Sequence, residues 1–135
     1  MTESPKQYAL TLVVPVHDPQ APELANLLAS IERQTFPKDQ LEVLICGEGN
    51  SEEARASGIR RAHGDIIGCL DADNQLLGFE FLSRLLAAAR EPDVCGAYPS
   101  HYAWFADDAP LNRYFALLGA NDPLAWWLCK ADRRS

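Results

Sequence analysis

The chain has 135 residues, of which 47% are hydrophobic and 23% charged, a balance typical of one soluble globular domain with a buried core. Twelve basic and nineteen acidic residues give a net charge of −7, which argues against nucleic acid or an anionic membrane surface as the main partner. The four cysteines are widely spaced and include no Cys-x-x-Cys pair, which argues against a zinc site or disulfide framework and favours a cytoplasmic location.

The first part of the chain alternates between strand-like and helix-like segments. Short apolar runs predict strands over residues 10–16, 41–46, 66–70 and 94–98. Apolar periodicity and capping residues predict helices over 22–34, 52–63 and 76–90, with Ser51 as the cap of the second. This alternating order predicts an α/β fold with a mostly parallel sheet flanked by helices.

The pattern weakens after His101. Residues 110–119 are predicted to be helical, and residues 123–130 form an apolar stretch that contains the adjacent Trp126 and Trp127. We expect this tail to cover one face of the sheet, or to be covered by a second copy of the chain or another partner.

Three loops are expected to meet at one edge of the sheet, because the carboxyl ends of parallel strands lie together and ligands bind beyond them. These loops are residues 17–18, 47–50 and 71–74. The second contains Gly47-Glu48-Gly49, but Glu52 stands where a dinucleotide-binding fingerprint needs its third glycine.

The third loop begins with two carboxylates one residue apart, Asp71 and Asp73. On an extended backbone they would point the same way, and two such carboxylates need a cation or a proton between them. Oxygen ligands of this kind suit Mg²⁺ or Mn²⁺, which take phosphate oxygens and waters as their other ligands. From the spacing alone, the alternative that two acids simply end a strand and begin a loop stays open.

Several segments together carry a family pattern. Residues 10–18 read Leu-Thr-Leu-Val-Val-Pro-Val-His-Asp, and residues 24–37 carry Leu-x-x-Leu-Leu-x-Ser-Ile-x-x-Gln-Thr-Phe-Pro. Residues 41–45 read Leu-Glu-Val-Leu-Ile, and 54–73 carry Ala-Arg-x-x-Gly-Ile-x-x-Ala-x-Gly-Asp-Ile-Ile-x-x-Leu-Asp-Ala-Asp. The ordered set, from about residue 10 to 98, resembles family 2 glycosyltransferases and implies the Rossmann-like, nucleotide-sugar-binding half of the GT-A fold.

The resemblance implies a glycosyltransferase that binds a UDP-, GDP- or dTDP-linked sugar together with Mg²⁺ or Mn²⁺. The sugar would be transferred to an unknown acceptor with inversion, while the ion stabilises the departing nucleotide diphosphate. The residues implied for the nucleotide sugar are Pro15, Val16, His17, Asp18, Glu48, Arg55, Asp71 and Ala72, and those implied for the metal are Asp73 and Asp71.

The chain departs from the family pattern in three ways. Gly47-Glu48-Gly49-Asn50 stands where the family usually has Asp-Asp-Gly-Ser, and Ala56 replaces an asparagine. The acceptor site and the base carboxylate of the family lie beyond Ser135, so we assign no catalytic base. We therefore expect a single, truncated GT-A-like domain over 1–135, with a donor-binding half at about 10–98, a helical apolar tail at 99–135, and unknown activity on its own.

Two alternatives to this function stay open. One is a non-catalytic interaction module that keeps the GT-A fold, which the altered Glu48 and Ala56 favour. The other is a Toprim-like, metal-dependent nucleic-acid enzyme, suggested by Glu48-Gly49 followed by Asp-x-Asp but disfavoured by the acidic charge. Peripheral attachment at the inner face of a membrane is the alternative to a purely cytoplasmic location.

Overall fold

The computed structural model describes residues 7–99 and 103–118. The chain divides into two compact units, residues 1–96 and 97–135. The first contains a parallel sheet and its covering helices, and the second contains one described helix. The α/β fold predicted from the sequence is confirmed.

The sheet of the first unit is built around β1 (Tyr8–Pro15), which is buried from Leu10 onward. It pairs in parallel with β2 (Leu41–Cys46) on one side and β3 (Gly64–Cys69) on the other, in the order β2-β1-β3. In this register Leu12 lies beside both Val43 and Gly68. A central strand covered on both faces is continuously apolar instead of alternating, which explains the sequence of β1.

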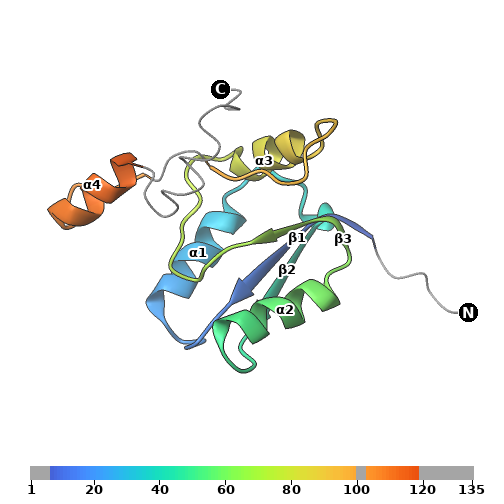
Figure 1. Ribbon diagram of the computed structural model, residues 1–135, viewed down its shortest axis with the longest axis horizontal. Helices are drawn as coiled ribbons and strands as arrows, with labels where there is room; N and C mark the ends of the chain where they lie inside the picture. Colours follow the sequence, from blue (N-terminus) through green and yellow to red (C-terminus); the bar gives the residue numbers. More distant parts are fainter. Residues whose placement is uncertain (1–6, 100–102, 119–135) are drawn as a thin grey trace, which may run out of the picture. The chain divides into compact units, whose positions relative to one another are not determined.

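Helices cover both faces of this sheet (Figure 1). On one face, α1 (Pro22–Glu32) and α3 (Phe81–Ala89) pack on β1, and a short 3-10 helix, η1 (Lys38–Gln40), precedes β2. The core on this face consists mainly of leucine, isoleucine and valine side chains, including Leu10, Leu12, Val14, Leu24, Leu27, Ile31, Leu82 and Leu86.

On the other face, α2 (Ser51–Arg61) packs on β1 and β2 through Ala54, which lies against Val13 and Cys46. Gly58 permits this close approach, because a Cβ atom there would lie 2.3 Å from Cγ1 of Val13.

A polar network closes the sheet at the end opposite the carboxyl edge. Glu42 accepts hydrogen bonds from the Thr11 hydroxyl at 2.7 Å and from the His63 backbone N–H at 2.9 Å. The hydroxyl of Thr11 in turn accepts from the N–H of Gly64 at 2.8 Å. The network therefore ties β1, β2 and the start of β3 together.

The predicted strand over residues 94–98 is wrong, since the described chain has no strand after β3. Asp93 has a left-handed φ of 66°, and the N–H of Val94 turns back to the carbonyl of Glu91. Val94 is 40% and Tyr98 62% exposed. The run is apolar enough for a strand but is not paired with the edge of β3.

The helix predicted over 76–90 begins later, at Phe81. Gly78 has a left-handed φ of 70°, which interrupts helical geometry. Before it, the N–H of Leu76 donates to the hydroxyl of Ser30 in α1. Leu76 nevertheless joins the core, so its apolar character is explained by burial in a loop.

The second unit contains α4 (Pro110–Leu118), which confirms the helix predicted there. The guanidinium of Arg113 lies 4.8 Å from the centroid of the Trp104 ring. Trp126 and Trp127 lie outside the described residues. Among the residues that the structure describes, no helix has the length and apolar content that crossing a bilayer requires.

Candidate functional site

The parallel register brings the three predicted loops to one edge of the sheet. The N–H of Val16 donates to the carbonyl of Cys46 at 2.8 Å, which joins the chain leaving β1 to the end of β2. The N–H of Leu70 donates to the carbonyl of Val13 at 3.0 Å, which joins β1 to the chain leaving β3. Loops 17–18, 47–50 and 71–74 therefore all start from this edge.

Asp71 and Asp73 lie in a tight turn and not on an extended strand. The carbonyl of Asp71 accepts from the N–H of Asn74 at 3.0 Å, and Oδ1 of Asp73 accepts from Nδ2 of Asn74 at 3.1 Å. The strand alternation used to argue that both carboxylates face one way therefore ends before Asp71. Both side chains are exposed at the rim.

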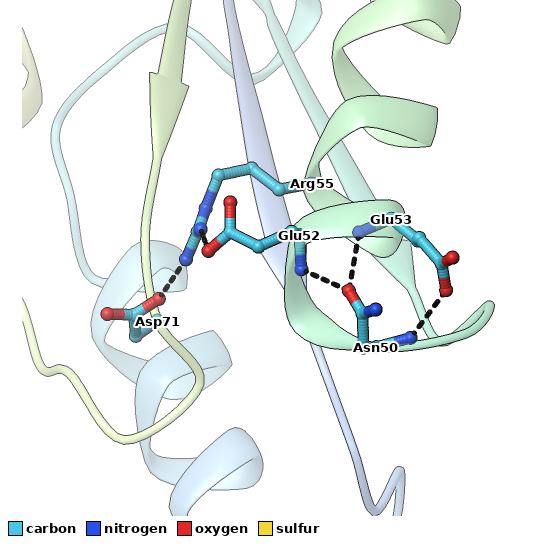
Figure 2. Close-up of polar contacts among 5 residues, drawn as sticks. All are labelled: Asn50, Glu52, Glu53, Arg55 and Asp71. Atoms are coloured by element: carbon cyan, nitrogen blue, oxygen red, sulfur yellow. Dashed lines mark hydrogen bonds and ion pairs between the residues drawn. The ribbon is translucent and has the colours of Figure 1, made fainter.

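Arg55 of α2 holds the first of these carboxylates. Its Nη2 lies 3.0 Å from Oδ1 of Asp71, and its Nη1 lies 2.9 Å from Oε1 of Glu52 (Figure 2). Burial of the guanidinium opposes its charge, but the hydrogen bonds and charges of Glu52 and Asp71 outweigh this and raise the pKa of Arg55 above its ordinary value. The rim thus carries a permanent positive charge beside Asp71.

The loop after β2 is fixed by a capping box at the start of α2. Oδ1 of Asn50 accepts from the N–H groups of Glu52 and Glu53 at 3.0 Å each, and Oε2 of Glu53 accepts from the N–H of Asn50 at 2.9 Å (Figure 2). The cap is therefore Asn50 and not Ser51, which is the first helical residue. The box sets the direction in which α2 leaves the rim and so helps to place Arg55.

The other residues implied by the resemblance are placed as follows. Pro15 and Val16 are buried at the end of β1, whereas His17 and Asp18 are exposed. Oδ1 of Asp18 accepts from the N–H of Gln20 at 2.9 Å, which fixes the turn into α1. Ala72 is half-buried within the 71–74 turn.

Glu48 has a partner that the sequence pattern does not indicate. Its Oε1 lies 3.0 Å from Nη1 of Arg61, at the end of α2. The Glu48 side chain is 61% exposed and the Arg61 side chain 49% exposed. The structure therefore pairs Arg55 with Asp71 but turns Glu48 toward a different arginine.

The carboxylates at this edge have donor chemistry that suits a hard divalent cation. Asp71 and Asp73 provide oxygen ligands only, which is what Mg²⁺ and Mn²⁺ prefer. Within residues 7–99 and 103–118 there is no cluster of three or more His, Cys, Asp or Glu side chains suited to a metal ion. An ion held here would therefore need phosphate oxygens and water to complete its coordination.

Two buried polar residues of α1 and the turn after it were given no role by the sequence argument. Ser30 and Gln34 are 0% and 4% exposed, and both bond to the segment that follows Asp73. Their spacing could have indicated their burial, because it places both polar residues on the same helix face as the apolar Leu27 and Ile31.

Comparison with known families decides what kind of domain this is. The model described as glycosyl transferase family 2 matches residues 47–126, which is more than half of the chain and includes Arg55, Asp71 and Asp73. The chain belongs to glycosyltransferase family 2. None of the curated proteins matches the chain.

Membership in family 2 supports a glycosyltransferase-type function. A domain of this family implies binding of a nucleotide-sugar donor in general, and family members often use divalent metal ions. The carboxyl edge described above is where a ligand binds on a parallel α/β sheet.

Proposed function

We propose that this family 2 domain binds the nucleotide diphosphate of a UDP-, GDP- or dTDP-linked sugar at the carboxyl edge of its sheet, with Mg²⁺ or Mn²⁺ held by Asp71 and Asp73. The sugar would then be transferred to an acceptor hydroxyl with inversion. The observation that carries the proposal is the contact between Arg55 and Asp71, because it sets a fixed positive charge and exposed carboxylates side by side at the expected donor position.

A metal-bound diphosphate requires carboxylates that bind the ion and a positive charge that binds the phosphates, and this rim has both. The chain as a whole carries −7, so its long-range field repels a free nucleotide diphosphate. A divalent ion, when bound, reverses the local field and stabilises the charge that develops on the leaving diphosphate. Arg55 adds a second positive charge, and its two amino groups match the spacing of phosphate oxygens.

The other rim residues would recognise the nucleoside. The backbone of residues 15–17 leaves β1 beside the start of the 47–50 loop and would contact the base and ribose. Glu48 can accept an N–H of the base only if it leaves Arg61. That exchange is easy, because an exposed ion pair contributes no more than about 1 kcal/mol.

Nucleotide-dependent thermal stabilisation tests the proposal. We expect UDP, GDP or dTDP to raise the melting temperature of the full chain with Mn²⁺ and much less without it, since a ligand at about 100 times its Kd stabilises by about 2.7 kcal/mol. Asp73→Ala should abolish the effect of Mn²⁺. Asp39→Ala, which removes an exposed acid of η1, should leave it unchanged. Equal stabilisation of both variants, or none of the wild type, would contradict the proposal.

The alternative of a non-catalytic module is favoured by one observation, the pairing of Glu48 with Arg61 away from Asp71. It predicts no stabilisation by any of the three nucleotides. A Toprim-like enzyme predicts stabilisation by DNA instead. The same melting experiment, with DNA added to the ligand panel, therefore separates all three functions.

A further inference from the structure

We propose that Ser30 and Gln34 are positioning residues, which hold the segment 74–82 against α1 and thereby fix where Asp71 and Asp73 lie. This inference rests on the proposed function, because it assigns to α1 control over the proposed metal ligands. It concerns residues that touch neither the donor nor the ion.

The segment between β3 and α3 has no regular secondary structure of its own. Residues 70–80 run from the end of β3 past α1 to α3 (Figure 1), and most of their side chains are exposed. Leu76 is buried, at 4% exposed, and packs in the main core, and Leu70 and Ala72 are half-buried against the same core. An exposed loop needs other contacts to hold a defined backbone conformation.

Those contacts come from α1 and the turn after it. The N–H of Leu76 donates to Oγ of Ser30 at 3.0 Å, and Nε2 of Gln34 donates to the carbonyl of Gly78 at 2.8 Å. Oε1 of Gln34 accepts from the N–H of Leu82 at 3.2 Å. The buried amide of Gln34 therefore binds the segment at two points, Gly78 and Leu82, on either side of residues 79–81.

Thr35 adds a third anchor to the same segment. The carbonyl of Phe79 accepts from the backbone N–H of Thr35 at 2.8 Å and from its hydroxyl at 3.0 Å. Ser30, Gln34 and Thr35 thus all bind the segment that directly follows the proposed metal ligands.

The hydrogen bonds of Ser30 and Gln34 are buried, so their loss would leave polar groups without a partner and lower the stability of this conformation. Among the described residues, every buried side-chain nitrogen and oxygen has a hydrogen-bond partner. An apolar residue at position 34 would fill the same space, but it would leave the carbonyl of Gly78 and the N–H of Leu82 unpaired. The buried polar side chains of Ser30 and Gln34 therefore favour one conformation of the segment, which apolar side chains of the same volume would not do.

The carboxylates lie between two fixed points. Leu70 is bonded to β1 through Val13, and Leu76 is bonded to α1 through Ser30. Only residues 71–75 span the interval, which at most reaches about 3.5 Å per residue. Because so few residues separate the anchors, we expect a shift of the second anchor to displace the turn that holds Asp71 and Asp73, and small displacements of ligands weaken a metal site.

The test compares variants that remove the anchors with one that removes equivalent bonds elsewhere. Gln34→Met removes the amide at similar volume, and Ser30→Ala removes the hydroxyl with a smaller change. Thr11→Val is the control, because it removes two side-chain hydrogen bonds of a fully buried residue at the other end of the sheet. Calorimetry would measure the Kd of Mn²⁺ with whichever of UDP, GDP and dTDP stabilises the wild type most, at a temperature where all variants are folded.

We expect Gln34→Met and Ser30→Ala each to raise this Kd at least tenfold, and Thr11→Val to change it less than twofold. Hydrogen–deuterium exchange of the ligand-free protein gives a second readout. Peptides that contain residues 71–74 should exchange faster in Ser30→Ala and Gln34→Met than in the wild type or in Thr11→Val. Unchanged exchange at 71–74 in Gln34→Met and Ser30→Ala overturns the inference.

The two readouts separate this inference from the proposed function. Suppose that the wild type binds no Mn²⁺-nucleotide, but Ser30→Ala and Gln34→Met speed hydrogen–deuterium exchange of residues 71–74. Then the donor proposal fails and the positioning role stands. If the wild type binds and all three variants weaken binding equally, the effect is general destabilisation and the positioning role is refuted.

Discussion

Replacement of Arg55 by glutamine tests whether its guanidinium serves the donor or only the fold. The change removes the contacts to Glu52 and Asp71, whose side chains are 83% and 63% exposed. Ion pairs this exposed contribute about 0 to 1 kcal/mol each, so we expect the melting temperature to fall by only a few degrees. If Arg55 contacts the diphosphate, a charge-assisted hydrogen bond of about 1.5–3 kcal/mol is lost, which is about a 10- to 150-fold rise in Kd.

Two calorimetric titrations measure the effect of Arg55→Gln. Binding of the preferred nucleotide in the presence of Mn²⁺ should weaken by that factor. Binding of Mn²⁺ alone should stay equal or strengthen, because Arg55 no longer competes for Oδ1 of Asp71. Weaker binding of the nucleotide without weaker binding of Mn²⁺ is the signature of an arginine that exchanges Asp71 for the diphosphate.

The control and the refuting results are clear. Arg60→Gln removes an exposed arginine from the same helix and should leave both titrations within twofold of the wild type. A nucleotide Kd for Arg55→Gln that also stays within twofold refutes the assigned role. So does a collapse of the melting temperature, which would make Arg55 a structural residue.

Two further predictions concern stability. Burial alone would raise the pKa of Glu42, but hydrogen bonds from His63 and Thr11 outweigh it and hold that pKa below the ordinary value of 4.5. The stabilisation by Glu42 is therefore complete above about pH 5 and is lost as the pH falls below 4.5. The free energy of unfolding in urea should fall over this pH range in the wild type, and it should depend less on pH in Glu42→Gln. Gly58→Ala places a Cβ 2.3 Å from Val13 and should cost about 1–3 kcal/mol in the same assay, whereas Ser57→Ala should cost little; equal unfolding midpoints would contradict the close packing of α2.

The sheet could be predicted from the sequence because the apolar pattern of a strand indicates which of its faces are buried. The continuous apolar run of β1 indicates burial on both faces, and the alternation with helices indicates parallel pairing. Residues 94–98 show the limit of this reasoning. The run is apolar, but a strand forms only where the chain is paired, and Asp93 instead turns the chain with a left-handed φ of 66°.

The meeting of the three loops at one edge of the sheet could also be predicted, but the contacts made there could not. The convergence of the three loops follows from parallel topology alone. Which arginine meets which acid depends on the direction of α2, so Arg55 reaches Asp71 and Arg61 reaches Glu48. The anchoring by Gln34 joins residues 44 positions apart, and no local pattern records such a contact.

The exposed ion pairs at the carboxyl rim have a consequence for how this domain can diverge. We expect most of the free energy of folding to come from the apolar layers and the buried hydrogen bonds of Glu42, Ser30 and Gln34, and little from the exposed ion pairs of Glu48 and Arg55. Under the proposed function, single substitutions at Glu48 or Arg55 would therefore alter donor preference at little cost in stability. Selection for a new donor can act on this edge one residue at a time.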